Sequence, residues 1–161
     1  MDLLVKNPAK MLKKRPERGS IPVSKAMPIK KVYRLISHAR DWERVHFDPR
    51  PLALTLFLFD TGCRIGGAAG LTRDHLFLDS YDLIDGCKVY QAHLFEKGNS
   101  DPNIYYFGID TAVVLRRLLL THTGKTVFGY KGRSTDGNNL GAYFRKCGKR
   151  AKIGSWGPHS M

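Results

Sequence analysis

Three basic residues, Arg64, Lys97 and His159, are candidates for a reactive site. Arg64 comes four residues after Asp60, at the end of an apolar run; Lys97 lies in a polar turn-forming stretch; His159 lies in the last segment. A guanidinium can bind two oxygens of one phosphate, and an ammonium or imidazolium can protonate an oxygen. The set therefore suits phosphate chemistry. Taken singly, the ordinary explanations are an Arg64 paired with Asp60 or Asp74, a solubilising lysine and an inert terminal histidine.

The cysteines indicate no disulfide or metal chemistry. Cys63, Cys87 and Cys147 are odd in number, widely spaced and not part of a Cys-x-x-Cys motif. This pattern argues against a disulfide framework and a structural zinc site, and it favours a reducing compartment.

The charge of the chain points to a polyanionic partner. The 161 residues include 27 Lys+Arg and 14 Asp+Glu, a formal net charge of +13. A hydrophobic content of 42% and an aromatic content of 11% allow a real core, which excludes disorder for most of the chain. The most apolar window, residues 51–59, is shorter than the roughly 20 residues of a membrane-spanning helix, and no signal peptide is visible. We expect nucleic acid as the partner; the alternative is a basic domain that binds ribosomes or a membrane surface.

The positive charge gathers toward the two ends of the chain. Residues 1–31 hold nine Lys and Arg, and no acidic residue follows Asp136. A helix predicted over 139–152 has apolar residues on one side and only cations on the other, whereas a merely solvated face usually mixes signs. The candidate DNA-binding residues are Arg73, Lys131, Arg133, Arg145, Lys146, Lys149 and Arg150.

The helices that must position these side chains can be placed from the apolar spacing. Proline and glycine among basic residues predict a linker or arm over residues 1–23, and a helix should start at Pro28. Residues 51–60 are apolar on all sides, which predicts a buried central helix that ends at Gly62 in a left-handed cap, with a short helical turn to Leu71 after it. The apolar stripe of the first helix is expected to be Ile29, Val32, Leu35, Ile36 and Ala39.

Three β-type segments follow these helices. They cover residues 76–78, 87–95 and 103–109, and the polar stretch between the last two predicts a hairpin. Asp110 is expected to cap a helix through His122. The sequence thus predicts an α+β fold that is mainly helical, with a small three-stranded antiparallel sheet.

Five features together resemble the tyrosine recombinase (phage integrase) family. Leu54–Leu71, with its Thr-Gly-Cys-Arg-Ile turn, resembles the first arginine box, and Lys97-Gly98 resembles the lysine turn of the family's sheet. The basic helix over 139–152 resembles the approach to the second box, and Pro158-His159-Ser160-Met161 resembles the opening of a His-x-x-Arg motif. Asn7-Pro8-Ala9 resembles the junction before the catalytic domain.

The resemblance implies DNA recombination or integration by strand breaking and rejoining through a 3′-phosphotyrosyl intermediate. Residues 1–23 would be the interdomain linker and residues 24–161 the catalytic domain. Arg64 would stabilise the phosphate, Lys97 would protonate the leaving 5′-oxygen, and His159 would hydrogen-bond the phosphate. No cofactor or metal would be required. The implied partner is double-stranded DNA, bound by a homo-oligomer (a tetramer on DNA), with a cytoplasmic, nucleoid-associated location typical of a mobile-element enzyme and no membrane association.

Two departures from the family pattern keep alternatives open. Gly67 stands where the family usually has an acidic residue, and the second arginine and the tyrosine nucleophile would lie beyond Met161. Tyr130 and Tyr143 precede the histidine motif and do not correspond to the nucleophile. We therefore expect an incomplete catalytic domain that is inactive alone. The alternatives are a non-catalytic DNA-binding relative and a type IB topoisomerase-like enzyme.

Overall fold

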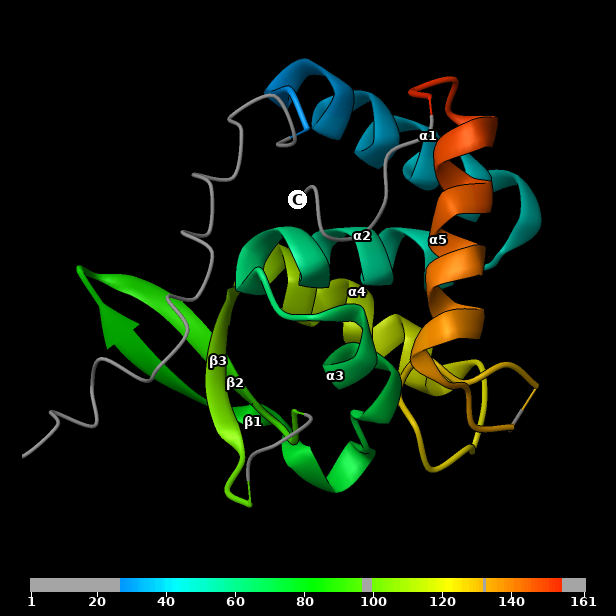
Figure 1. Cartoon of the computed structure of the whole chain (residues 1–161). Coiled ribbons are helices and arrows are strands. Elements are labelled where there is room, and N and C mark those ends of the chain that lie inside the picture. Colours follow the sequence, from blue (N-terminus) through cyan, green and yellow to red (C-terminus); the bar gives the residue numbers. More distant parts are fainter. Residues whose placement is uncertain (1–26, 97–99, 132, 155–161) are drawn as a thin grey trace, which may run out of the picture.

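The computed structural model describes residues 27–96, 100–131 and 133–154, and it has the expected α+β architecture (Figure 1). The predicted linker over residues 1–23 lies outside these ranges. Three helices come first, then a short 3₁₀ helix η3 and three strands, then two helices. Their bounds are α1 Ile29–His46, α2 Arg50–Thr61, α3 Ile65–Gly70, η3 Arg73–His75, β1 Leu76–Ile84, β2 Cys87–Leu94, β3 Asn103–Gly108, α4 Ile109–Leu120 and α5 Gly137–Arg150.

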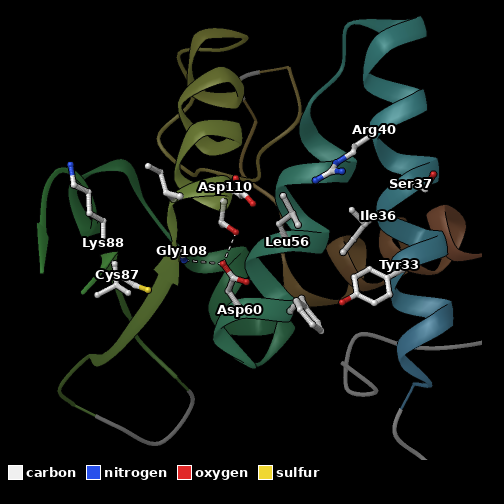
Figure 2. A pocket seen from close by; sticks show the side chains of 14 residues that line it. Tyr33, Ile36, Ser37, Arg40, Leu56, Asp60, Cys87, Lys88, Gly108 and Asp110 are labelled. Atoms are coloured by element: carbon white, nitrogen blue, oxygen red, sulfur yellow. Dashed lines mark hydrogen bonds between the residues drawn. The ribbon is translucent and has the colours of Figure 1, made fainter. Parts of the chain in front are cut away.

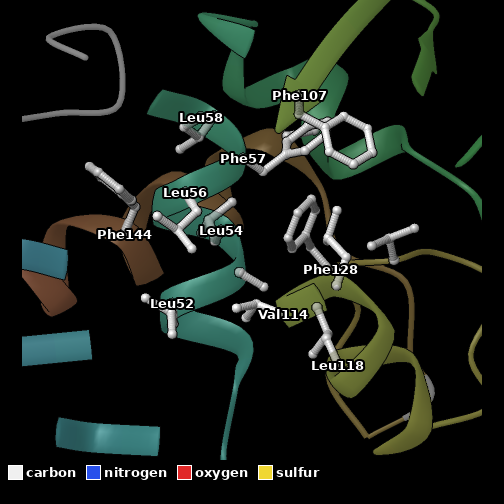
Figure 3. Packing of buried hydrophobic residues seen from close by; sticks show 14 of the residues in the cluster. Leu52, Leu54, Leu56, Phe57, Leu58, Phe107, Val114, Leu118, Phe128 and Phe144 are labelled. Atoms are coloured by element: carbon white, nitrogen blue, oxygen red, sulfur yellow. The ribbon is translucent and has the colours of Figure 1, made fainter. Parts of the chain in front are cut away.

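Helix α2 forms the centre of the core, as its apolar sequence predicts. Every residue from Arg50 to Leu58 is buried, and α2 packs against α1, α4, α5 and β3 (Figure 1). The ring of Phe57 lies 5.6 Å from that of Phe107 and 5.5 Å from that of Phe128, measured between centroids (Figure 3). This core fixes the end of α2 and therefore the loop that follows it.

Gly62 ends α2 in the left-handed conformation predicted for it. Its φ is 61°, and its backbone N–H donates to Leu58 O at 3.0 Å. Glycine adopts this conformation without steric cost, so the chain can turn sharply toward α3.

The three strands form an antiparallel sheet in the order β1-β2-β3, and β2 and β3 make the predicted hairpin. Their pairing runs from Val89↔Gly108 to Leu94↔Asn103. Strand β1 is longer than the predicted 76–78 segment, because it continues past an irregularity after Phe77 and pairs with β2 again from Asp82.

One side chain of α1 and the starts of α4 and α5 differ from the sequence predictions. Ile29 is 51% exposed, so it does not join the buried stripe of α1, whose other four members are buried. Asp110 is not the cap of α4, because that helix begins at Ile109 and its cap position is Gly108. Helix α5 begins at Gly137, two residues before the predicted start near residue 139, with its cap residue Asp136 accepting a hydrogen bond from Asn139 N at 2.7 Å.

Asp60 of α2 caps the start of α4, the role that was predicted for Asp110. Asp60 Oδ2 accepts hydrogen bonds from Gly108 N at 2.9 Å and from Thr111 Oγ1 at 2.6 Å (Figure 2). The first turn of α4 leaves backbone N–H groups without helical partners, and Asp60 satisfies one of them from outside the helix. The end of α2 is therefore tied to the start of α4.

No helix within the described residues is long and apolar enough to span a bilayer.

Candidate active site and nucleic-acid interface

Arg64 projects from the loop between α2 and α3, with buried residues on both sides of it. Cys63 is 5% exposed and Ile65 is 9% exposed, whereas the Arg64 side chain is 67% exposed. The backbone at Arg64 is extended, with φ −69° and ψ 143°. Since the core holds both neighbours, the position of Arg64 is set by the fold while its guanidinium remains open to solvent.

The acidic partner of Arg64 is Glu96, which lies two residues after the end of β2 at Leu94. Arg64 Nη1 donates to Glu96 Oε2 at 3.2 Å, and Arg64 N donates to Oε1 at 3.4 Å. Tyr105 of β3 donates from its hydroxyl to the same Oε1 at 2.9 Å. The Glu96 side chain is only 10% exposed. A structural pairing of Arg64 with Asp60 or Asp74 is therefore wrong.

Two ionisable groups near Glu96, the Tyr105 hydroxyl and the Cys63 thiol, have raised pKa values. Burial raises the pKa of Tyr105 to about 12, and its hydrogen bond to the Glu96 carboxylate adds to the shift. Burial likewise raises the pKa of the Cys63 thiol to about 11, with a smaller contribution from the charge of Glu96. At neutral pH Tyr105 is thus a hydrogen-bond donor and Cys63 is a neutral thiol.

The Glu96 carboxylate fills the space beside Gly67. A Cβ atom on Gly67 would lie 3.6 Å from Glu96 Cγ and 3.7 Å from Glu96 Oε1. The helix position where the sequence lacks an acid is thus adjacent to a carboxylate that comes from the hairpin.

Sequence reasoning missed Glu96, although the strand pattern carried a signal for it. Side chains alternate between the faces of a strand, and Ala92 and Leu94 are buried. Continuing the same alternation puts Glu96 on the inner side of the sheet. A buried carboxylate needs donors, and Arg64 and Tyr105 provide them.

The other two predicted catalytic residues cannot be placed. Lys97 follows Glu96 in the sequence, but Lys97 and His159 both lie outside the described residues. The structure therefore places Arg64 alone among the three.

Most of the predicted DNA-binding cations are exposed. Arg145, Lys146 and Lys149 are exposed on α5, as are Lys131 and Arg133 in the turn closed by the Tyr130–Arg133 bridge. Arg150 is exposed too, but its guanidinium carbon lies 4.2 Å from the ring centroid of Trp42 on α1. This contact covers one face of the Arg150 guanidinium and does not use its N–H donors, which lie in the plane of the group.

Arg73 has its donors engaged inside the fold. Its Nε donates to Gly124 O at 2.9 Å, and its Nη2 donates to Leu119 O at 3.0 Å and also to His122 O. These acceptors lie at and just after the end of α4, so the guanidinium satisfies carbonyls that the helix leaves without partners. The structure gives Arg73 an internal role, in contrast to the exposed cations.

Helix α5 runs from the Arg64 loop toward α1. Its first residue, Gly137, packs against Gly66 of α3, two residues after Arg64. At 1.5 Å per residue, Arg145 and Arg150 lie about 12 and 20 Å along the axis from that contact. The cations of α5 thus form a band that leads away from the Arg64 loop.

A separate groove of about 720 Å³ lies between α1, α2, β2 and the start of α4 (Figure 2). Its lining includes Tyr33, Ile36, Phe59 and Asp60 but neither Arg64 nor Glu96. It is not part of the Arg64 site. Among the residues that the structure describes, no three His, Cys, Asp or Glu side chains group as ligands for a metal ion.

Comparison with known proteins gives a likeness of fold. No protein-family model matches the chain, and no curated protein matches it. Among solved structures, a crystal structure of XerA recombinase is similar, with a TM-score of 0.65 and 20% sequence identity. The match covers 92% of this chain and 49% of that chain, so the present chain spans about half the length of that structure.

Proposed function

We propose that this chain is part of a tyrosine-recombinase-type catalytic domain that, together with a segment carrying the tyrosine nucleophile, breaks and rejoins the strands of duplex DNA. The observation that carries the proposal is Arg64, whose exposed guanidinium is held by a nearly buried carboxylate in a fold similar to that of XerA recombinase. The net charge of +13 supports a DNA partner. An assembly of several copies on DNA belongs to the same proposal.

The proposed role of Arg64 is to stabilise charge on the scissile phosphate. Its Nη1 donates a hydrogen bond to Glu96, whereas its Nε and Nη2 make no hydrogen bond to any residue in the described ranges. These donors can bind nonbridging phosphate oxygens, on which negative charge develops during the reaction. Loss of one such donor typically slows a reaction by about 10²–10³-fold.

The proposed reaction transfers the phosphoryl group of a DNA phosphodiester from a 5′-oxygen to a tyrosine. A phenolic oxygen gives up its proton to solvent and forms a bond to phosphorus, the bond from phosphorus to the 5′-oxygen breaks, and that oxygen takes a proton from Lys97. His159 hydrogen-bonds the phosphate. The reverse attack by a 5′-hydroxyl rejoins a strand and releases the tyrosine.

Tyr143 does not fit the role of the nucleophile. It is half-buried, the guanidinium carbon of Arg50 lies 4.2 Å from its ring centroid, and burial raises its pKa. In this proposal the tyrosine comes from a segment that is not part of the 161 residues.

A nicked suicide DNA substrate tests the proposal. The chain would be assayed alone and fused to a recombinase segment that carries the second arginine and the tyrosine, with covalent adducts resolved on a denaturing gel. We expect an adduct only from the fusion, and a loss of about 10²–10³-fold in its rate for Arg64→Ala. Arg44→Ala is the matched control, because Arg44 is also exposed and paired with an acid, Asp41.

The same assay isolates the lysine step. Lys97→Ala should slow cleavage of a normal 5′-oxygen far more than cleavage of a 5′-thio leaving group, which needs no protonation. Equal rates for Lys97→Ala and its parent on the normal substrate would remove Lys97 from the mechanism.

A non-catalytic DNA-binding relative is the second candidate, because Gly67 departs from the family's acidic position. DNA binding without an adduct from the fusion would favour it. A chain that neither binds DNA nor forms an adduct would overturn both candidates.

A further inference from the structure

We propose that Glu96 is the positioning residue of Arg64: the carboxylate fixes one side of the Arg64 guanidinium and leaves the other side free for a phosphate. This inference rests on the proposed function for the identity of the anion. In this inference the acidic residue comes from the hairpin, whereas the family usually has it on helix α3, at position 67.

Three donors meet at the Glu96 carboxylate. They are the backbone N–H of Arg64 and the Tyr105 hydroxyl at Oε1, and the Arg64 Nη1 group at Oε2. An ionised carboxylate only accepts hydrogen bonds, so it can satisfy all three at once. A glutamine side chain in either orientation would turn its NH₂ group toward at least one of these donors. The site therefore requires a charged acid and not merely a polar side chain.

The contacts from Glu96 hold both ends of Arg64. One reaches the backbone of the loop and the other reaches the guanidinium, although the side chain is 67% exposed. An exposed arginine without such a partner would sample many rotamers, which weakens any bond that requires a fixed geometry. The nearly buried Glu96, held from a third side by Tyr105, restricts this motion.

Gly67 makes room for this arrangement. A Cβ on Gly67 would be in van der Waals contact with Glu96 Cγ and Oε1, so a side chain at position 67 would lie beside the carboxylate. The glycine and the glutamate are thus complementary: the carboxylate approaches from the strand because the helix offers no side chain. This relation predicts that an acid on α3 can replace Glu96.

The test uses the full chain and a 20-base-pair duplex of arbitrary sequence. Glu96→Gln is the main variant, and Glu96→Ala combined with Gly67→Asp is the rescue variant. Glu43→Gln is the matched control, because Glu43 pairs with Arg117 at 3.0 Å and its loss changes the net charge equally. Circular dichroism and thermal melting would establish that each variant is folded.

The first measurement follows Arg64 itself in the absence of DNA. Nitrogen NMR distinguishes a held guanidinium, whose two Nη groups give separate signals, from a freely rotating one, whose Nη signals merge. We expect separate Arg64 signals in the parent, in Glu43→Gln and in the rescue variant, and merged signals in Glu96→Gln. Separate signals in Glu96→Gln would overturn the inference.

The second measurement is a double-mutant cycle on DNA affinity. Arg64→Ala should raise the dissociation constant on the order of tenfold in the parent, as for the loss of charge-assisted hydrogen bonds. In the Glu96→Gln background the same change should have less than about a third of that effect, whereas in the Glu43→Gln background it should keep it. An Arg64 effect that grows in Glu96→Gln would show that Glu96 competes with the phosphate, which also overturns the inference.

The two measurements separate this inference from the proposed function. If Arg64→Ala leaves DNA affinity unchanged while the Arg64 signals still merge in Glu96→Gln, positioning stands and the phosphate role of Arg64 fails. If the parent binds DNA through Arg64 but Glu96→Gln changes neither the signals nor the cycle, the phosphate role stands and positioning fails.

Discussion

Gly66 and Gly137 bring two helices together at the base of the Arg64 loop, because Gly66 Cα lies 3.1 Å from where a Cβ on Gly137 would stand. Gly137→Ala should therefore force α5 away from α3 and lower the free energy of unfolding by about 1–3 kcal/mol, the usual cost of overpacking. Urea denaturation measures this loss. Gly66→Ala is the control, since a Cβ there meets nothing within 4 Å and should be neutral or stabilising by up to about 1 kcal/mol. Equal losses in the two variants would contradict the close contact.

Asp60 is expected to matter more for α4 than the acid inside that helix. Asp60→Ala removes the acceptor of Gly108 N and of the buried Thr111 hydroxyl, which should cost about 1–2 kcal/mol of unfolding free energy. Asp110→Ala removes only an exposed charge in the first turn and should cost about 0.3–1 kcal/mol. Chemical denaturation of the two variants compares them. A larger loss for Asp110→Ala would restore Asp110 as the cap.

Reversal of the charges on α5 should weaken binding to all DNA sequences alike. Lys146, Lys149 and Arg150 are exposed, and phosphate contacts carry no sequence information. Replacing all three by Glu should lower affinity and reduce the slope of log K against log salt by about 0.9 for each lost phosphate contact. Fluorescence anisotropy at several salt concentrations gives both values. Unchanged affinity and slope would mean that this helix face is only solvated.

Stability should fall at alkaline pH, in part through Cys63. The pKa of the Cys63 thiol is about 11 in the folded chain and 9.0 ordinarily. Its full contribution to the free energy of unfolding is therefore present below pH 9. Between pH 9 and 11 the unfolded chain loses the proton first, and unfolding becomes easier by at most about 2.7 kcal/mol. Tyr105 and Cys147, whose pKa values are also raised, act in the same direction.

The urea midpoint measured from pH 8 to 11 checks this alkaline loss. Cys63→Ala should reduce the decline, whereas Cys87→Ala, at an exposed position, should leave it as in the parent. An unaltered decline in Cys63→Ala would exclude the buried thiol as its source.

Local patterns predicted the features that depend on residues close together in the sequence. The apolar run of α2, the left-handed cap at Gly62 and the β2–β3 hairpin depend on neighbours a few residues apart, and the structure has all three. The α+β class follows from them.

What the sequence did not predict depends on contacts across the fold. Asp60 caps a helix that begins 49 residues later, and Glu96 meets an arginine 32 residues earlier. The alternation along β2 indicates that Glu96 faces inward, but residues nearby in the sequence do not identify the partner of Asp60 or of Glu96. The exposed outer part of β1 was missed for a related reason: it is paired only with β2 and lacks a buried face that would show as alternation.

The register of the β2–β3 pairing also decides on which face of the sheet Glu96 lies. Because side chains alternate in a strand, a shift of one residue in the pairing from Val89↔Gly108 to Leu94↔Asn103 would turn Glu96 to the opposite face. A single inserted residue in β2 could therefore disconnect Arg64 from its carboxylate while every residue of the site is still present in the chain. In this fold, the identity of the site residues is not sufficient, and the count of residues between them is part of the site.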